Sequence, residues 1–332
     1  MDRVDREVAA ALVAHPRAAW SVLARALGLS EATASRRARA LLARGRVRPI
    51  AALDVLAIGR GTPVFIGLRC ASGTALQVAD ELAGWPQVRF VAVLSGTTDV
   101  LIEVVVADQE DLLELTQEHL PRVPGVLGCR SEVILKRYAT GSSWDPGVLE
   151  PSVVAGLQAG RPDRWARAQP TEPATAPTEV DTAIAHALGQ DGRLTWRELG
   201  QRCAITEFTA RRRTEAMFAT GALKLRTLVH PADLGLSVSA YLWFHVHPTR
   251  VDNVAKQLTD RREVVLLCAA AGTSNLCAEV VVPSYAALHS FLTNTLGGVP
   301  GVRDVEVSVV LRVVERAGLR MPFPPRAGQS ST

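Results

Sequence analysis

Two stretches of the chain place hydroxyl and guanidinium side chains at helical spacing. Guanidinium groups bind guanine and phosphate through paired hydrogen bonds, and hydroxyl groups bond to base edges or to phosphate oxygens. One helix carrying such side chains would contact DNA, although the solvated face of a small basic helical domain has the same composition. The candidate DNA-contacting residues are Ser30, Thr33, Ser35, Arg36, Arg37 and Arg39 in the first stretch, and Thr206, Thr209, Arg211, Arg212 and Arg213 in the second.

Two glycine-containing segments between apolar runs are candidate contacts for a small molecule. Glycine lets the backbone approach a ligand carboxylate closely, and the carboxylate of Asp99 could bind an ammonium group. Ordinary β-turns use the same residue types for conformational reasons, so both interpretations stay open. Asn275 replaces Asp99 in the second segment, so the two sites would differ. The candidate ligand-binding residues are Ser95, Gly96, Thr97, Thr98 and Asp99, and Gly272, Thr273, Ser274 and Asn275.

Motifs of common catalytic and cofactor sites are missing from the sequence. It contains no GxSxG, HExxH or phosphate-loop pattern, and its five scattered cysteines form no CxxC pair. His245 and His247 lie two residues apart on an expected strand and would share one face, without a third ligand nearby. We therefore expect no catalytic residue, no metal site and no cofactor.

The segments that carry these residues occur twice. A shift of 176 residues aligns the chain with itself without a gap, so that Trp20 falls on Trp196. The tetrapeptides EVVV and VPGV, which begin at Glu103 and Val123, recur at the same offset. Two such matches at one offset are very improbable by chance, so the two halves should share one fold.

Each half opens with about fifty residues whose apolar spacing predicts three helices. In the first half, an apolar stripe begins at Val4, and further helices are expected over 20–27 and 31–43. Gly28 ends the second helix, and Ser30 is a good N-cap for the third. A tight glycine turn between the second and third helices is typical of a helix-turn-helix, whose third helix enters the major groove of DNA.

After each helical block the apolar period changes to two, which predicts strands. The order strand, helix, strand, strand, helix, strand is the ferredoxin-like pattern. Two helices cover one face of such a sheet, and the other face needs a partner, from the same chain or from another. The expected strands are 63–70, 89–94, 99–106, 131–138, 239–246, 264–269, 276–282 and 305–313, and the expected helices are 75–82, 109–119, 251–258 and 284–296.

The sequence thus predicts an α+β protein with two copies of a winged helix-turn-helix domain followed by a ferredoxin-like βαββαβ domain. The expected units are 1–50, 60–138, 179–226 and 236–316, with a linker at 139–178 and a loose tail at 317–332. A short helix is expected within the linker, from Val148 to Leu157. The segment 161–178 is rich in Pro, Ala and Thr and lacks a periodic apolar face.

Charge and hydropathy favour an anionic partner inside the cell. The net charge is +4, and residues 1–50 contain ten arginines against four acidic residues, as a DNA-binding surface would. The sequence contains no uninterrupted run of about 18 apolar residues, so no membrane-spanning helix is expected. No signal-peptide pattern opens the chain, so a cytoplasmic, nucleoid-associated protein without a membrane partner is expected.

The ordered set of motifs resembles the leucine-responsive/asparagine-regulator (Lrp/AsnC) family of transcription factors. Val4-Asp5 and Val180-Asp181 resemble the start of the family's first helix, and Leu27-Gly28-Leu29-Ser30 resembles its helix-turn-helix turn. The segment 94–99 resembles the hairpin of its effector domain, and 120–126 resembles the segment before its last strand. The resemblance covers most of residues 2–138 and 180–314, so an ordinary family unit would be present twice.

The resemblance implies a regulator that binds double-stranded DNA and pairs its effector domains sheet to sheet. It further implies homo-oligomers and an amino acid or similar small molecule bound near the two glycine segments. The two halves could pair within one chain or between chains. An alternative is an enzyme of the sirohaem decarboxylase type, which shares the architecture, and a third is a ligand-binding module without DNA binding. The central strands 89–94 and 264–269 are not enriched in the cationic, His and Tyr side chains that tetrapyrrole chemistry would require.

Overall fold

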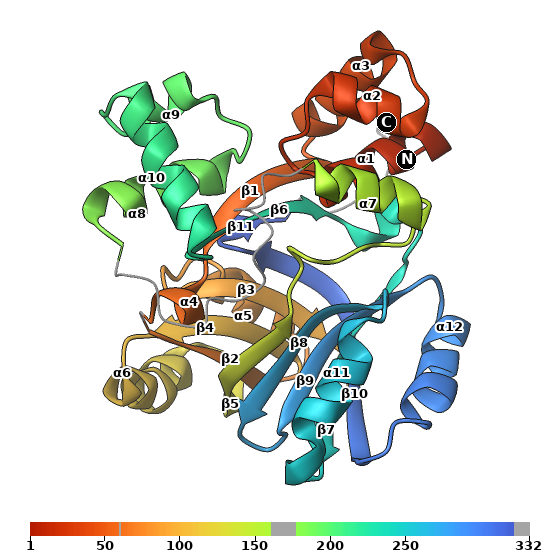
Figure 1. The fold of residues 1–332 in the computed structure, drawn as a ribbon. Helices are drawn as coiled ribbons and strands as arrows, with labels where there is room; N and C mark the ends of the chain where they lie inside the picture. The colour runs from red at the N-terminus through yellow and green to blue at the C-terminus, as the bar shows by residue number, and fades with distance from the viewer. Residues whose placement is uncertain (60, 161–176, 322–332) are drawn as a thin grey trace, which may run out of the picture.

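The computed structural model describes residues 1–59, 61–160 and 177–321 (Figure 1). Two three-helix units lie at one end of a large curved sheet, and a two-stranded ribbon lies between them and the sheet. Part of the expected linker and most of the expected tail, residues 161–176 and 322–332, fall outside the described residues. Because the three-helix unit occurs twice, the repeat in the sequence is also a repeat in the structure.

Both helical units contain the expected helices. Gly28 ends the second helix in the left-handed region at φ 63°, and Ser30 and Thr206 cap the third helices through their side chains. In the first unit, Leu12, Leu23 and other apolar side chains of all three helices form one buried cluster. The helices are α1 (Arg3–Ala14), α2 (Trp20–Leu27) and α3 (Glu31–Ala43), and α8 (Glu179–Gln190), α9 (Trp196–Arg202) and α10 (Glu207–Ala219).

The strand that follows each third helix pairs with its counterpart in the other half. Strand β1 (Val47–Leu53) runs antiparallel to β6 (Leu223–Val229), with Ile50 opposite Arg226. The ribbon also exchanges partners, because β6 packs on α1 and β1 packs on α8. Neither strand could be assigned this partner from periodicity, since the pairing joins residues about 176 positions apart.

The remaining strands form one closed sheet. Around it run β3, β4, β2, β5, β8, β9, β7 and β10, and β10 pairs with both β7 and β3. Strands β5 and β8 join the halves on one side, and β10 and β3 join them on the other. The strands are β2 (Thr62–Cys70), β3 (Val88–Leu94), β4 (Val100–Val106), β5 (Val126–Ala139), β7 (Val238–Val246), β8 (Val264–Ala271), β9 (Leu276–Val282) and β10 (Val302–Arg316), with β11 (Leu319–Arg320) at an edge.

Apolar side chains fill both faces of this sheet. Separate outer clusters lie under the helices of each half, while an inner cluster combines residues of both. Phe65 lies edge-on to Tyr241 and Trp243, with ring centroids 5.9 and 6.0 Å away. The uncovered sheet face predicted from sequence is thus buried against the other half of the same chain. The helices are α5 (Ala75–Leu82), α6 (Gln109–Glu114), α11 (Val251–Thr259) and α12 (Tyr285–Ser290), with a short α4 (Val55–Ile58) before β2.

Several elements differ from their expected bounds. Strands β5 and β10 are longer than predicted. The added start of β5 pairs with β2 of the same half, and the added end of β10 pairs with β3 of the other half. The helices expected over 109–119 and 284–296 change to π-helical turns at Leu115 and Phe291. The helix expected from Val148 is α7 (Pro151–Ala159), which begins at its proline and buries Leu157 against α1 and α2. Apolar residues between 144 and 157 therefore pack on the first helical unit.

Candidate DNA interface, hairpins and charged cavity

The third helix of each helical unit begins in the same way. The Ser30 hydroxyl accepts the Thr33 amide at 3.2 Å and donates to the Thr33 hydroxyl at 2.9 Å. Thr206 and Thr209 repeat both bonds in the second unit at the same distances. These four hydroxyl groups, expected as base contacts, thus also fix where each recognition helix starts.

Two of the expected DNA-contacting arginines are held within the protein. Arg37 binds the carboxylates of Asp2 and Asp5, the latter at 2.9 Å, and so ties α3 to α1. Its repeat counterpart, Arg213, binds Asp181 at 3.1 Å and the Thr178 hydroxyl at 3.1 Å. Because these guanidinium groups are engaged with the first helix, the structure gives them a bracing role that helical spacing alone could not reveal.

The other cations of the recognition helices are exposed. Arg36 and Arg39 extend into solvent from α3, and Ser35 is half-buried. On α10, Arg212 is exposed, while Arg211 pairs with Glu215 at 3.0 Å. The second recognition surface is therefore less cationic than the first, because Glu215 is the repeat counterpart of Arg39.

Phe208 lies near the start of α10, among the side chains that are expected to face the bases. Its side chain is 74% exposed, although burial would be expected for phenylalanine in a folded domain. Its position two residues after the Thr206 cap is where base edges are met in this motif. The first copy has Ala32 at this place, so the two recognition helices differ here.

The two helical units are joined by an arginine from each. Arg17, in the turn after α1, donates to the backbone carbonyl of Gly192 at 2.6 Å and to that of Leu194 at 2.7 Å. Its guanidinium carbon lies 4.7 Å from the ring centroid of Trp196, the first residue of α9. The first unit thus holds the turn and helix of the second through one side chain.

Arg193 makes the reciprocal contacts. It donates to the carbonyls of Pro16 at 2.7 Å and Ala18 at 3.0 Å, and it lies 4.1 Å from the ring centroid of Trp20. Burial, and then the nearby charge of Arg17, lower the pKa of Arg193 to about 10. The relative placement of the two recognition helices is therefore set by a symmetric pair of contacts, which we call the arginine clasp.

The first glycine hairpin, residues 95–99, lies against β10 of the other half. The Ser95 amide donates to the Val309 carbonyl at 2.8 Å, and Thr97 binds Glu306. The Asp99 carboxylate accepts the Cys70 amide at 2.8 Å, so it closes the hairpin onto β2. The Asp99 carboxylate, which was expected to bind an ammonium group, thus uses one of its oxygens to hold the turn.

The second hairpin, residues 271–275, has a different neighbour, and Gly272 does not adopt the positive φ of 104° that Gly96 has. Asn275 bonds to both the amide and the carbonyl of Val246, at 2.9 and 2.7 Å. The carboxylate of Glu132, from β5 of the other half, accepts the Thr273 amide at 3.1 Å and the Ser274 amide at 3.3 Å. Burial raises the pKa of Glu132 against the lowering effect of these bonds. The protein itself therefore supplies an oxyanion to this hairpin.

The two histidines of interest each bind a close neighbour. His245 Nε2 lies 2.8 Å from the Thr273 carbonyl, and His247 Nδ1 lies 2.9 Å from the Thr249 hydroxyl. Among the described residues, no group of three or more His, Cys, Asp or Glu side chains is arranged to hold a metal ion.

In the described part of the chain, no helix is both long and apolar enough to cross a membrane.

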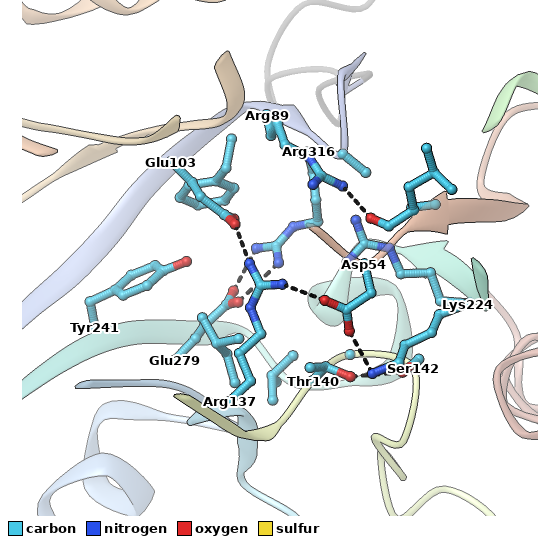
Figure 2. A pocket seen from close by; sticks show the side chains of 18 residues that line it. Asp54, Arg89, Glu103, Arg137, Thr140, Ser142, Lys224, Tyr241, Glu279 and Arg316 are labelled. Atoms are coloured by element: carbon cyan, nitrogen blue, oxygen red, sulfur yellow. Dashed lines mark hydrogen bonds and ion pairs between the residues drawn. The ribbon is translucent and has the colours of Figure 1, made fainter. Parts of the chain in front are cut away.

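A charged cavity of about 110 Å³ lies between the β1–β6 ribbon and the sheet (Figure 2). Arg137 bridges Glu103 at 2.7 Å and Asp54 at 3.3 Å, and Lys224 also binds Asp54, at 2.7 Å. Sequence reasoning did not bring these residues together, because they come from separate segments of both halves. The available signal was a charged residue, such as Glu103, on a strand that is otherwise apolar.

Comparison with known proteins identifies both kinds of domain twice. The Lrp/AsnC ligand binding domain matches residues 63–144 and 239–319, and the AsnC-type helix-turn-helix domain matches residues 1–42 and 178–217. An uncharacterized HTH-type transcriptional regulator of Pyrococcus furiosus is 31% identical over 136 residues, which are 41% of this chain and 92% of that protein. The HTH-type transcriptional regulator Ptr1 of Methanocaldococcus jannaschii is 26% identical over 145 residues, covering 43% and 97%.

The solved structures include a likeness over nearly the whole chain. The siroheme decarboxylase NirDL, in complex with an iron-uroporphyrin III analogue, has a TM-score of 0.58 at 15% identity, covering 90% of this chain and 87% of that one. At this identity the likeness concerns the fold, namely two paired units in a single chain. The chain belongs to the Lrp/AsnC family of helix-turn-helix transcriptional regulators, with two complete family units joined in one polypeptide.

Proposed function

We propose that this regulator presents α3 and α10 together to two DNA half-sites. The observation that carries the proposal is the arginine clasp, because Arg17 and Arg193 fix the spacing of two capped recognition helices before DNA is bound. Helix-turn-helix dimers read half-sites whose separation follows the spacing of their recognition helices. Here one chain supplies both helices, so half-site binding does not depend on dimerisation.

The proposed contacts differ between the two recognition helices. On α3, Arg36 and Arg39 would bind phosphate or guanine, while Ser30, Thr33 and Ser35 lie at its N-terminal end. On α10, Thr206, Thr209, Arg211 and Arg212 have the same places, and Phe208 would add an apolar contact to a thymine methyl group. The two half-sites are therefore expected to differ in sequence.

An amino-acid effector would bind at the first hairpin rather than at both. Ser308 stands where the other half has Glu132, so no carboxylate reaches the amides of Thr97 and Thr98 within the described chain. The Ser308 hydroxyl is buried and lacks a hydrogen-bond partner among the described residues. The carboxylate of an amino acid would supply the missing acceptor, as Glu132 does at the second hairpin.

Space around the hairpins supports the same assignment. A side chain on Gly272 would collide with the Glu132 carboxylate, whereas the first atom of a side chain on Gly96 would lie 3.5 Å from the Ser308 hydroxyl. Gly67 packs beside Thr98, and its repeat counterpart is the large Trp243. The Arg130 guanidinium also lies close to Gly67, so the first hairpin is bordered by Gly67 and Ser308 together with one arginine.

Oligomerisation through the effector-domain sheets is also proposed. Leu135 and Leu311 are repeat counterparts on β5 and β10, and they are 60% and 62% exposed. Exposed leucines at equivalent places on both halves would let a second copy bind with either half. As a DNA-binding regulator, the protein would act in the cytoplasm, on the nucleoid.

The alternative of a sirohaem-type decarboxylase has one observation in its favour. Cationic side chains and Tyr241 do meet at the cavity beside the ribbon, and one of these cations, Arg89, comes from the central strand 89–94. That cavity, at about 110 Å³, is smaller than the roughly 300–1,000 Å³ of sites for drug-sized ligands, and a tetrapyrrole is larger than most of these. The intact recognition helices favour the regulator.

Binding to its own upstream DNA across a salt series tests the proposed function. Tight binding that survives excess unrelated DNA, with a steeply negative slope of log affinity against log salt, is the expected result. Binding that the unrelated DNA abolishes would contradict sequence-specific regulation at that site. A screen of amino acids for altered DNA affinity would then identify the effector.

A further inference from the structure

The cavity beside the ribbon contains more positive than negative side chains. Five cations line it together with three carboxylates, and these are Arg89, Arg137, Lys224, Arg226 and Arg316, with Asp54, Glu103 and Glu279. Figure 2 labels all of these except Arg226 and shows the labelled side chains converging from the ribbon and from the strands of both halves. Like charges gathered in a poorly solvated space repel one another, so a formal excess of two positive charges requires an explanation.

The three carboxylates are already used by three of the cations. Arg137 binds Glu103 and Asp54, Lys224 binds Asp54, and Arg316 binds Glu279 through two hydrogen bonds of 2.9 and 2.5 Å. These pairs satisfy the acids of the cavity. Two cations remain without a carboxylate.

The first of the remaining cations is Arg226. Its Nε atom is buried and has no hydrogen-bond partner among the described residues. Burial, and then the charges of Arg316 and Arg89, lower the pKa of Arg226 to about 10, so it remains charged at neutral pH. A buried guanidinium group without an anion is costly, and proteins rarely retain one without a counter-ion.

The second cation without a carboxylate partner is Arg89. Its guanidinium group bonds to the backbone carbonyl of Leu53 at 3.3 Å, and no ion pair of Arg89 is formed within the described chain. The repeat counterparts of Arg89, Arg137 and Arg226 are Val265, Val313 and Ile50, so the fold does not require arginine at these places. The positive excess belongs to this cavity and is not a consequence of the duplicated scaffold.

We propose that this cavity is a binding site for a small oxyanion, a phosphate or a short dicarboxylate, held between Arg226 and Arg89. Arginine forms paired hydrogen bonds with both groups, and a charge of about −2 would cancel the excess. The hydroxyl group of Tyr241 points into the cavity and could donate a further hydrogen bond (Figure 2). The volume of about 110 Å³ limits the ligand to a few non-hydrogen atoms. This site is separate from the two hairpins.

Thermal unfolding and calorimetry without DNA test the site, so the outcome is independent of DNA binding. The protein is compared in sodium phosphate, sodium malonate and sodium chloride at equal ionic strength. At about 100 times Kd, an oxyanion is expected to raise Tm by about 5 °C over chloride. A response to phosphate alone, or to malonate alone, would support the site and identify its ligand chemistry.

The variant Arg226→Met should lose this response, with binding at least about tenfold weaker. The variant should be no less stable than the unaltered protein in chloride, because the substitution removes an uncompensated charge. If Arg226 had only a structural role, the variant would be destabilised and would still respond to oxyanions. The matched control is Arg303→Met, since Arg303 is exposed on β10, away from the cavity. If Arg226→Met does not fold, Arg89→Gln gives the same comparison. An equal Tm in all three salts, or an unchanged response of the folded variant, would overturn the proposal.

Discussion

Arg17 and Arg193 hold the two helical units together through reciprocal contacts. Each donates to two backbone carbonyls of the other unit and lies over a tryptophan that starts the second helix there. In a family with one unit per chain, such a contact would form only on dimerisation. In this chain it is intramolecular, so the geometry of the recognition helices is independent of protein concentration.

Breaking the arginine clasp should change which spacings of the two DNA half-sites the protein binds. We expect Arg17→Gln to weaken binding to a fragment with both half-sites by about tenfold, because the second helix is no longer held in place. Binding to a single half-site should change little. Gel shifts with half-sites at several spacings would check this, since the variant should tolerate more spacings. An unchanged spacing preference would show that the ribbon alone sets the geometry.

The exposed arginines of α3 should contribute most of the salt dependence. Replacing Arg36 or Arg39 by Ala should reduce the slope of log affinity against log salt by about one for each phosphate group that the variant no longer binds. Arg211→Ala should have a smaller effect, because that side chain pairs with Glu215. Arg303→Ala, on the distant β10, is the control. Equal effects of Arg36 and Arg303 substitutions would refute an α3 interface.

Acid should destabilise the second helical unit through Asp181. Burial raises its pKa, but bonds from Thr178 and Arg213 outweigh this and lower the pKa below 3.8. The carboxylate therefore contributes stability that is present above pH 3.8 and is lost as the pH falls through the lowered value. Arg213→Ala should cost about 1 kcal/mol at neutral pH and shift acid unfolding upward, measured by far-ultraviolet circular dichroism. Arg211→Ala should leave the acid transition in place, and an equal shift in both variants would contradict the bracing role of Arg213.

The hairpins should bind unequal amounts of effector. Calorimetry with the amino acid found by screening should give one site per chain, because Glu132 already fills the second hairpin. Glu132→Ser removes the carboxylate that occupies the second hairpin and should raise the stoichiometry to two. Ser308→Glu is the reciprocal variant and should abolish binding. Two sites in the unaltered protein would contradict this assignment.

The exposed leucine pair should support self-association. Leu135→Lys combined with Leu311→Lys should lower the molar mass measured by light scattering, because charge opposes the burial of that surface. The same change at Leu127, which is 65% exposed but has Arg303 as its repeat counterpart, is the control. An unchanged mass in the double variant would place the contact between copies elsewhere.

Local structure was predictable because local residues determine it. The cap at Ser30, the glycine at position 28 and the apolar period placed α2 and α3 at their observed bounds. The duplication was equally visible, since two identical tetrapeptides recur at one offset. From these features followed the helix-turn-helix and the ferredoxin-like order of strands, without knowledge of any contact between the halves.

Only the tertiary structure decided how the two halves pair and which arginines extend into solvent. The ribbon joins Val47 to Val229, and no local signal selects a partner so far along the chain. Arg37 and Arg36 are adjacent in sequence, yet α1 brings Asp2 and Asp5 to one and leaves the other in solvent. Closing the sheet brings arginines from distant strands around one cavity. Such sites arise from long-range packing, which the periodicity of a sequence does not encode.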